Sequence, residues 1–288
     1  MKAGKKNNFF IKLALGLNIL FAFCILVSYI SVYISPDKFW PIAFFGLAYP
    51  FLFLINIIFI IIWLIFRKKY SLLSFIVIII GINNLFKVAQ SSKKYEVSEL
   101  TDAVKVLSFN VRNFNIYKSK NTKETTYEKN RILSFLDKEN ADILCLQEYL
   151  NYTTGDLKFT DTLKKILDSK NEFVAYTGCG RKISFFGIAI FTTFPIVDTG
   201  RIAFNTVSGN ICIYSDIKIN EDTVRVYNVH FESIRMKSED YMFAEQLAKN
   251  PEELVAVRKN SKRILSRLKR ACIIRAPQVR LVSEHIEK

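Results

Sequence analysis

Histidine and cysteine are scarce in this sequence, and those present form no metal-binding pattern. The 288 residues include two histidines, His230 and His285, and five cysteines. No two cysteines form a Cys-x-x-Cys pair, and no spacing of Cys and His suits a zinc site, which excludes the zinc-finger classes. We expect Cys145 and Cys212, which lie in apolar strand-like patterns, to be buried thiols. The sequence also lacks an internal repeat.

Acidic residues are few: 26 Asp and Glu stand against 41 Lys and Arg, a formal charge of +15. Residues 1–100 hold 11 basic and 3 acidic residues, a balance of +8, and the rest holds 30 and 23, a balance of +7. Hydrophobic residues make up 50% of the chain, and its mean hydropathy is +0.17. Nearly all of the apolar excess precedes Leu85. Part of the basic excess therefore flanks apolar segments, where it suits anionic lipid headgroups.

The apolar N-terminal third has no signal-peptide cleavage site. It contains three apolar stretches, Phe9–Ile34, Phe39–Phe66 and Leu72–Phe86. No A-x-A site follows the first stretch, and a second comes directly after it, so a cleaved signal peptide is disfavoured. The first two are long enough to cross a bilayer as helices, and the third is shorter. We predict a membrane anchor over residues 1–90 with about three transmembrane helices.

Basic residues in the short flanks predict the orientation of this anchor. Three lysines lie within residues 2–6, and Arg67, Lys68 and Lys69 separate the second stretch from the third. This pattern places the N-terminus and that loop in the cytoplasm. If the third stretch crosses, the rest of the chain is extracytoplasmic. Three lysines after the third stretch favour the opposite side.

Residues 91–102 are polar and read as a linker, and strand and helix patterns alternate beyond them. The expected helices are amphipathic. Two of the expected strands, in "ICIYSDIKIN" and "TVRVYNVHF", are separated by the turn-like "NEDT" and suggest a hairpin. Strands are expected at Val104–Phe109, Asp142–Leu146, Phe173–Tyr176, Gly187–Thr192, Ile211–Ile219 and Val224–Val229, and helices at Glu128–Glu139 and Phe159–Leu167. This mixture predicts a sheet-rich α/β domain with strands buried between layers.

Three of these strand patterns end in a polar side chain that could take part in catalysis or ligand binding. "VLSFN" ends at Asn110, "ILCLQE" at Glu148 and "VYNVH" at His230. Ligand sites of layered α/β proteins collect at strand ends. A magnesium ion is often held by one or two carboxylates and a substrate phosphate, which would offset the burial of Glu148. Each residue also has a plainer interpretation: Asn110 as a turn residue, Glu148 as an exposed strand end, and His230 as a structural histidine.

The segments "KVLSFNVRNFN", "ADILCLQEY", "FFGIAIFTTFPIVDTGRI" and "VRVYNVHFESIRM" occur in the order typical of the endonuclease/exonuclease/phosphatase superfamily. The resemblance covers residues 103–288, and with the apolar stretches it extends to a membrane-anchored bacterial branch. It implies a two-sheet sandwich with outer helices, placed in a bacterial inner membrane as a multi-pass protein. It further implies a phosphoester (phosphodiester) hydrolase that requires Mg²⁺ or Mn²⁺. Its substrate would be a phosphate ester, and a nucleic acid (DNA or RNA), a sphingolipid or phospholipid, and an inositol phosphate all stay open; no protein partner is evident.

The resemblance assigns roles to the three polar residues. Glu148 would bind the catalytic metal, and Asn110 would lie beside the metal and the scissile phosphate. His230 would donate to a phosphate oxygen and stabilise the charge that develops there. The metal would act as a Lewis acid and orient the phosphoryl group.

The sequence departs from the family pattern in its later part. No Gly-Asp-x-Asn or Ser-Asp-His motif occurs, so the groups that activate water in the family are missing. We expect a domain truncated at its C-terminus and incomplete as a sandwich, with His285 as a surface helix residue that replaces neither motif. Two alternatives stay open: a catalytically dead membrane pseudoenzyme, or a basic protein that binds nucleic acid or lipid at a membrane.

Residues 258–280 form the basic stretch behind the second alternative. No aromatic residues lie between its charges, so stacking on single strands is unsupported. We interpret it as the solvated face of an amphipathic helix that Pro277 should kink or end. The basic residues are Arg258, Lys259, Lys262, Arg263, Arg267, Lys269, Arg270, Arg275 and Arg280.

We predict that the 288-residue chain is inactive as a hydrolase, because nothing in it is placed to activate water. General acid–base assistance alone contributes about 10²–10⁴-fold to such reactions. Purified chain should show no magnesium-dependent hydrolysis of plasmid DNA, RNA, sphingomyelin or an activated phosphodiester. Activity that disappears both with EDTA and in Glu148→Ala would contradict this, and would mean that a partner chain or another residue supplies the base.

Overall fold

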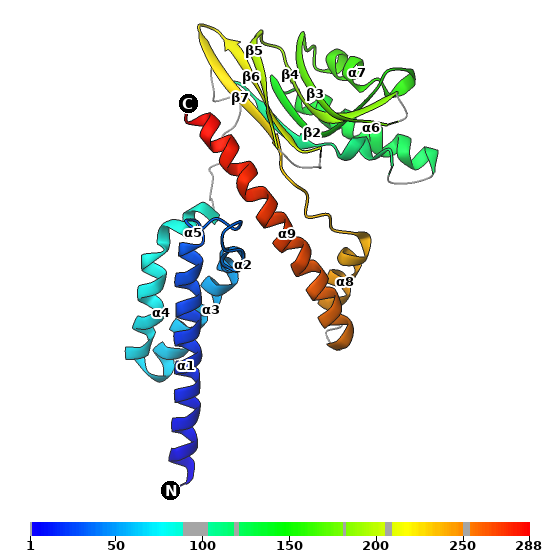
Figure 1. Cartoon of the computed structure of the whole chain (residues 1–288). Coiled ribbons are helices and arrows are strands. Elements are labelled where there is room, and N and C mark those ends of the chain that lie inside the picture. The colour runs from blue at the N-terminus through cyan, green and yellow to red at the C-terminus, as the bar shows by residue number, and fades with distance from the viewer. Residues whose placement is uncertain (1, 89–102, 118–120, 181–182, 205–208, 250–253) are drawn as a thin grey trace. The chain divides into compact units, whose positions relative to one another are not determined.

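The computed structural model describes residues 2–88, 103–117, 121–180, 183–204, 209–249 and 254–288 (Figure 1). The chain divides into two compact units. The helical unit comprises Met1–Lys94 and Ile234–Pro277, and the sandwich unit comprises Tyr95–Ser233 and Gln278–Lys288. Each is described by itself. The expected linker, residues 91–102, lies outside the described residues.

Two helices of the helical unit are long and apolar enough to cross a membrane. They are Phe9–Ile30 of α1 (Lys2–Ile30), with a mean hydropathy of 2.4, and α3 (Tyr49–Phe66), with 2.6. A third candidate is the pair α4 (Lys68–Ile80) and α5 (Ile82–Val88), which are bent by 59° at Gly81. A Cβ at Gly81 would collide with the ring of Tyr29, so a small residue is required at the bend.

The predicted apolar stretches differ from these helices in their bounds. The first helix ends at Ile30 rather than Ile34. The second stretch, predicted as one span over Phe39–Phe66, is divided into α2 (Pro41–Leu47) and α3. Proline lies in the first turn of both helices, where its missing N–H costs nothing, and inside one continuous helix it would break the hydrogen-bond ladder.

A chain of buried polar side chains joins α1, α3 and α4. Asn18 donates from Nδ2 to Ser74 Oγ (2.5 Å) and accepts at Oδ1 from Trp63 Nε1 (2.8 Å). Ser74 Oγ donates in turn to Asn56 Oδ1 (2.9 Å), and Asn56 Nδ2 donates to the carbonyls of Leu52 (2.9 Å) and Phe21 (3.2 Å). Because unpaired polar groups are costly in an apolar interior, these bonds fix how the three helices face each other.

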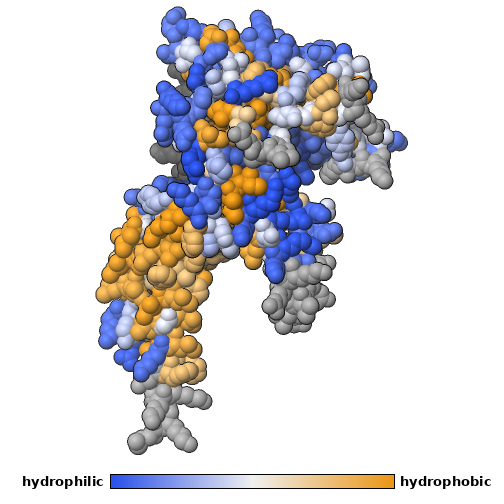
Figure 2. Space-filling view, in the orientation of Figure 1, coloured by the Kyte–Doolittle hydropathy of each residue, from blue (hydrophilic) through white to orange (hydrophobic). Residues whose placement is uncertain are grey.

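The outward faces of these helices carry large apolar side chains. Figure 2 shows hydrophobic residues over most of this surface, and Phe51, Ile65 and Phe66 are each at least 70% exposed. An exposed apolar surface of this extent marks an interaction with a membrane or another protein.

The later part of the helical unit contains α8 (Ser238–Lys249) and most of α9 (Leu254–Ile286). The buried carboxylate of Asp240 joins them: it pairs with Arg263 Nε (2.8 Å) and Arg267 Nη1 (2.8 Å). Pro277 was expected to kink or end the helix, and the second of these expectations is wrong, because α9 continues to Ile286. The residues after Pro277 are held by packing: Val282 lies buried beside Phe204 and Cys212.

The sandwich unit consists of two sheets. The four-stranded sheet has the order β1-β2-β4-β3, in which β1 runs parallel to β2 and the other pairs are antiparallel. The three-stranded sheet has the order β5-β6-β7 and is antiparallel. The strands are β1 (Val106–Asn110), β2 (Ile143–Tyr152), β3 (Asn171–Gly180), β4 (Ser184–Thr192), β5 (Ile196–Ala203), β6 (Ile211–Ile219) and β7 (Asp222–His230).

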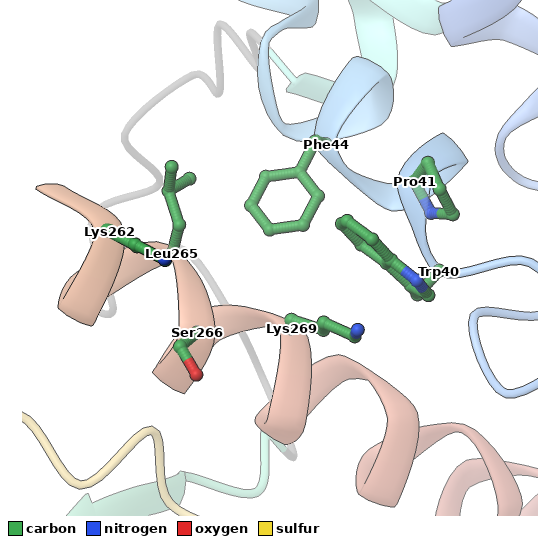
Figure 3. Close-up of a pocket in the computed structure, with 7 residues that line it drawn as sticks. All are labelled: Trp40, Pro41, Phe44, Lys262, Leu265, Ser266 and Lys269. Carbon is green, nitrogen blue, oxygen red and sulfur yellow. The ribbon is translucent and has the colours of Figure 1, made fainter.

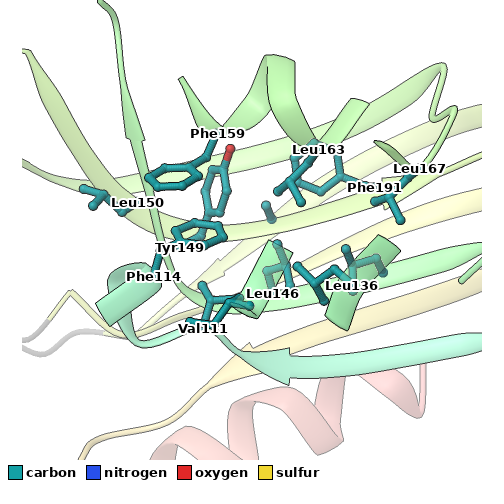
Figure 4. Packing of buried hydrophobic residues seen from close by; sticks show 13 residues of the cluster. Val111, Phe114, Leu136, Leu146, Tyr149, Leu150, Phe159, Leu163, Leu167 and Phe191 are labelled. Atoms are coloured by element: carbon teal, nitrogen blue, oxygen red, sulfur yellow. The ribbon is translucent and has the colours of Figure 1, made fainter. Parts of the chain in front are cut away.

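Three hydrophobic layers hold these sheets. The largest lies between the four-stranded sheet and α6 (Thr122–Glu139) and α7 (Phe159–Ile166), where Leu136, Leu146 and Phe191 are fully buried (Figure 4). A second, rich in isoleucine, lies between the sheets. A third covers the outer face of the small sheet with the end of α9. The predicted α/β two-sheet sandwich with helices on its outer faces is confirmed.

Individual elements were predicted unevenly. The hairpin of β6 and β7 is confirmed, with Asn220 at a φ of 53° in its turn, where asparagine is tolerated. Strand β5 was missed because it exposes most of its residues and has no apolar run. Helix α6 begins at Thr122, six residues before the predicted start, since the side chain of Asn121 caps it by accepting from Lys123 N.

Candidate active site

The three polar residues singled out from the sequence lie together at one end of the sandwich. Asn110 Nδ2 donates to Glu148 Oε1 at 3.0 Å, and His230 Nε2 lies 3.6 Å from the same oxygen. The second distance is slightly longer than a hydrogen bond. The side chains of Glu148 and His230 are 36% and 24% exposed. One carboxylate oxygen thus receives an amide and an imidazole from two different sheets.

A β-bulge presents Glu148 to these partners. Between Leu146 and Tyr149, β2 has one residue more than the facing segment Gly187–Ala189 of β4. Glu148 has a φ of 49°, which is unusual for a residue other than glycine. By simple alternation Glu148 would follow Leu146 into the helix-covered core, but the extra residue gives that place to Tyr149, which is fully buried. The prediction that the strand ends at Glu148 is wrong, since β2 continues to Tyr152.

Asn228 holds the bulge from the opposite sheet. Its side chain, 1% exposed, donates from Nδ2 to the carbonyls of Leu146 (3.0 Å) and Ala189 (2.9 Å). Its Oδ1 accepts from Gln147 Nε2 at 2.7 Å. Leu146 and Ala189 face each other where the ladder is interrupted, so one amide satisfies both carbonyls beside the bulge. Asn228 and His230 share a face of β7, so the strand that holds the bulge also supplies the imidazole.

The turn after β1 fixes the amide of Asn110. Asn110 Oδ1 accepts from the backbone N–H of Arg112 at 3.0 Å, which leaves Nδ2 aimed at Glu148. Residues 112–115 all have φ between 49° and 56°, a strained left-handed run. Phe114 anchors this turn: it is fully buried and stacks on Phe159 with ring centroids 3.7 Å apart (Figure 4).

The surroundings of Glu148 favour its ionised form. The neighbouring imidazole of His230 lowers the pKa of this carboxyl most, partial burial opposes that effect, and the amide of Asn110 lowers the pKa further. The positive charge of Arg112 acts in the same direction. A carboxylate that stays charged while half-exposed at the end of a sandwich is suited to bind a cation.

The sequence profile of the endonuclease/exonuclease/phosphatase family matches residues 107–259, more than half of the chain. The chain belongs to this family. Asn110, Glu148 and His230 all lie within the matched region. Residues 10–88 match a domain of unknown function (DUF8431). A comparison with curated protein sequences finds no match.

Solved structures of the endonuclease/exonuclease/phosphatase family show a distant likeness. D. rerio TDP2 humanized by 14 mutations has 18% identity and a TM-score of 0.36, with 53% of this chain and 58% of that chain covered. A family protein from Beutenbergia cavernae has 12% identity and a TM-score of 0.37, with 46% of this chain and 39% of that chain covered. A family protein from Leptotrichia buccalis has 15% identity and a TM-score of 0.35, with 52% of this chain and 63% of that chain covered. The chain thus spans less than two thirds of each.

A divalent metal fits the donor set of this site only in part. Across the described ranges, no three His, Cys, Asp or Glu side chains form a group that could enclose an ion. Mg²⁺ needs no such cage, because it retains waters and binds through one or two carboxylates and substrate phosphates. Glu148 is ionised, and the polar atoms of Asn110 and His230 lie beside it. This donor set suits a hydrated Mg²⁺ that binds a single protein carboxylate.

The other histidine lies away from this site. His285 Nδ1 is 2.9 Å from the hydroxyl of Tyr227, and its ring packs against Tyr214. Tyr227 and Asn228 alternate along β7, so His285 covers the face opposite to the site. Burial raises the pKa of the Cys145 and Cys212 thiols to about 12, as expected for inert, buried cysteines.

Sequence reasoning missed Gln147 and Asn228. A signal for Asn228 was present: in "VYNVH" it precedes His230 by two residues and therefore shares its face of the strand. Gln147 had no comparable signal, because its role depends on the bulge. Without the register of β2 and β4, Gln147 is one more polar residue at a strand end.

We expect Asn228→Ala to loosen the bulge, because two buried carbonyl groups lose their donor. Unsatisfied buried groups cost about 1–3 kcal/mol each, so the sandwich unit should lose about 2–6 kcal/mol of stability. Asn228→Asp should cost more, since a carboxylate would face two carbonyl oxygens. Hydrogen exchange of peptides from β2 and β7 measures the effect. Thr223→Ala, at an exposed position of the same strand, is the control, and equal exchange in the Asn228 and Thr223 variants would contradict this role.

Proposed function

We propose that this chain is part of a membrane-anchored, divalent-metal-dependent phosphoester hydrolase. The observation that carries the proposal is the convergence of Asn110 and His230 on one oxygen of Glu148 at a bulge. The fold family supports the reaction class, because its members are hydrolases of phosphate esters. The site then supplies the groups that bind the metal and the substrate: a carboxylate for a cation, and two donors for the oxygens of a phosphate.

Each residue has a distinct role in this proposal. Glu148 is the anionic ligand, kept ionised by its neighbours. His230 donates to a non-bridging phosphate oxygen and so stabilises the charge that develops during hydrolysis. Asn110, whose amide is held by Arg112 N, orients Glu148 and contacts the phosphate. A bound Mg²⁺ or Mn²⁺ supplies Lewis acidity toward the phosphoryl group.

Glu232 and Asp240, the two buried acidic side chains that follow His230 in the described residues, are poor candidates for activating water. Asp240 is buried between two arginines of α9. Glu232 is also buried, and its backbone N–H donates to Gln278 Oε1 at 2.9 Å. The 288 residues contain no Gly-Asp-x-Asn or Ser-Asp-His motif. We therefore propose that these residues bind metal and phosphate but do not by themselves complete hydrolysis.

The helical unit supplies the membrane part of the proposal. Two or three helices of sufficient length and hydropathy expose large apolar side chains on their outer faces. We propose that α1, α3 and the α4–α5 pair cross a bacterial inner membrane, with the sandwich unit on the extracytoplasmic side. The proposed substrate is a phosphate ester of a lipid or of a nucleic acid.

Glu148→Gln should weaken divalent-ion binding at this site by about 10–100-fold or more, because even the loss of a group that supports a metal ligand has an effect of this size. The chain has two histidines, so ¹⁵N-histidine labelling yields two sets of imidazole signals. Mn²⁺ bound at Glu148 should broaden the signals of His230 at a lower Mn²⁺ concentration than those of His285, which lies on the opposite face of β7. In Glu148→Gln the broadening should require correspondingly more Mn²⁺.

Glu221→Gln is the matched control for this measurement. It removes the same charge from the exposed turn between β6 and β7, in the sheet that carries His230, and should leave the titration unchanged. Equal broadening of His230 in wild type and Glu148→Gln would show that Glu148 does not bind the metal. Broadening of both histidines together would indicate binding elsewhere.

The proposed topology predicts that a reporter fused after Lys94 is extracytoplasmic. A fusion within Arg67–Lys69 should report from the cytoplasm, because that loop carries three basic residues. Alkaline phosphatase and green fluorescent protein fusions at both positions distinguish the two sides. A cytoplasmic signal after Lys94 together with a cytoplasmic signal in the loop would mean that the α4–α5 pair does not cross.

A further inference from the structure

Within the helical unit, α2 and α9 line a cavity of about 450 Å³. Figure 3 shows its two walls: aromatic rings from the α2 segment and two lysines from α9. The volume lies in the range of small-molecule sites. The lining residues are Trp40, Pro41, Phe44, Lys262, Leu265, Ser266 and Lys269.

The charges at this cavity have one sign. Lys269 Nζ lies 4.3 Å from the centroid of the Trp40 ring, and Lys262 lies on the same face of α9, two helical turns earlier. None of the lining residues is acidic. The nearby Arg263 and Arg267 pair with Asp240, so that carboxylate is already compensated by other side chains. The cavity therefore attracts an anion that also offers an apolar surface.

The place of α2 in the chain puts this cavity at a membrane boundary. Helix α2 connects the end of one membrane-length apolar helix, at Ile30, with the start of the next, at Tyr49. Tryptophan favours this level of the bilayer, where its ring meets both lipid tails and headgroups. If three segments cross, the chain that follows the third returns to the side on which α2 lies. Helix α9 can then meet α2 without passing through the membrane.

We propose that this cavity binds the headgroup of an anionic phospholipid. Lys262 and Lys269 bind the phosphate, Ser266 offers a hydroxyl, and Trp40, Phe44 and Leu265 pack against the glycerol and the upper acyl carbons. Charge of one sign, aromatic rings and a bilayer-level position together match this ligand better than nucleic acid, which would find no row of aromatic side chains for its bases. The inference rests on the proposed membrane insertion and is independent of hydrolysis at Glu148.

Tryptophan quenching in nanodiscs tests the site. The chain has two tryptophans, so Trp63→Phe leaves Trp40 as the reporter. Nanodiscs of phosphatidylcholine receive increasing fractions of either acyl-brominated phosphatidylglycerol or equally brominated phosphatidylcholine. Two lysines at about fivefold each enrich an anionic lipid by roughly 25-fold. Half-maximal quenching should therefore occur at a phosphatidylglycerol fraction at least about tenfold lower than that of phosphatidylcholine.

The double variant Lys262→Gln/Lys269→Gln should remove the difference between the two lipids. The matched control is Lys123→Gln/Lys138→Gln, which removes the same charge from exposed positions of α6 in the sandwich unit and should retain the difference between the two lipids. Quenching by both lipids at equal fractions would overturn the lipid site and leave the membrane anchor intact. Quenching by neither would show that Trp40 does not meet the bilayer, and would overturn the proposed membrane insertion as well.

Trp63→Phe also removes a hydrogen bond to Asn18, so a second measurement without that change is needed. Native mass spectrometry of the otherwise unaltered chain, released from nanodiscs that contain both lipids, counts bound lipid directly. Phosphatidylglycerol should remain bound, and the Lys262→Gln/Lys269→Gln variant should lose it. Retention of the lipid in that variant would contradict the assignment of the two lysines.

Discussion

The side chain of Asn228 is the constraint on which the candidate site depends. The hydrophobic layer between the sheets is built largely of isoleucines, and such contacts are non-directional, so they do not by themselves fix where β2 is interrupted. A buried amide does: its two N–H groups reach Leu146 and Ala189, and its oxygen receives Gln147. A register shift of either sheet would leave buried polar groups unpaired, so the bulge is held where Glu148 emerges.

Two strained segments lie on either side of this constraint, Glu148 itself and the left-handed run of residues 112–115. Neither conformation is favourable locally, and each persists because its neighbours are fixed. Phe114 is stacked in the core beneath the turn, and Tyr149 fills the core directly after the bulge. Gly187 faces Tyr149, and a Cβ there would collide with the carbonyl of Ala175 on β3, so the close approach of β3 requires a glycine at this position of β4. Strain of this kind is found where side chains must be held for binding.

The sequence was informative where a polar side chain lies at the end of a regular apolar pattern. Asn110, Glu148 and His230 were identified because apolar runs end at each of them, and the layered fold follows from the strand and helix patterns. The bulge was not predictable in this way, because one extra residue in β2 becomes visible only against the register of β4. Strand β5 was missed since an exposed strand has no apolar signature. The helix through Pro277 was missed because packing of Val282, which is remote in sequence from its partners, outweighs the local preference of proline.

In the helical unit, as in the sandwich unit, buried polar side chains fix the arrangement of apolar elements. The α1, α3 and α4 helices present almost uniformly apolar faces, and in a bilayer the surrounding lipid is as apolar as their contacts, so hydrophobicity cannot select one arrangement of the three. Asn18, Asn56 and Ser74 make that selection, because their bonds form in only one rotation of each helix. In both units, then, apolar residues supply the cohesion and a few buried amides determine the register. A buried asparagine with partners far away in the sequence therefore indicates a position at which this chain fixes its geometry, and Asn228 is the one that lies beside a carboxylate and an imidazole.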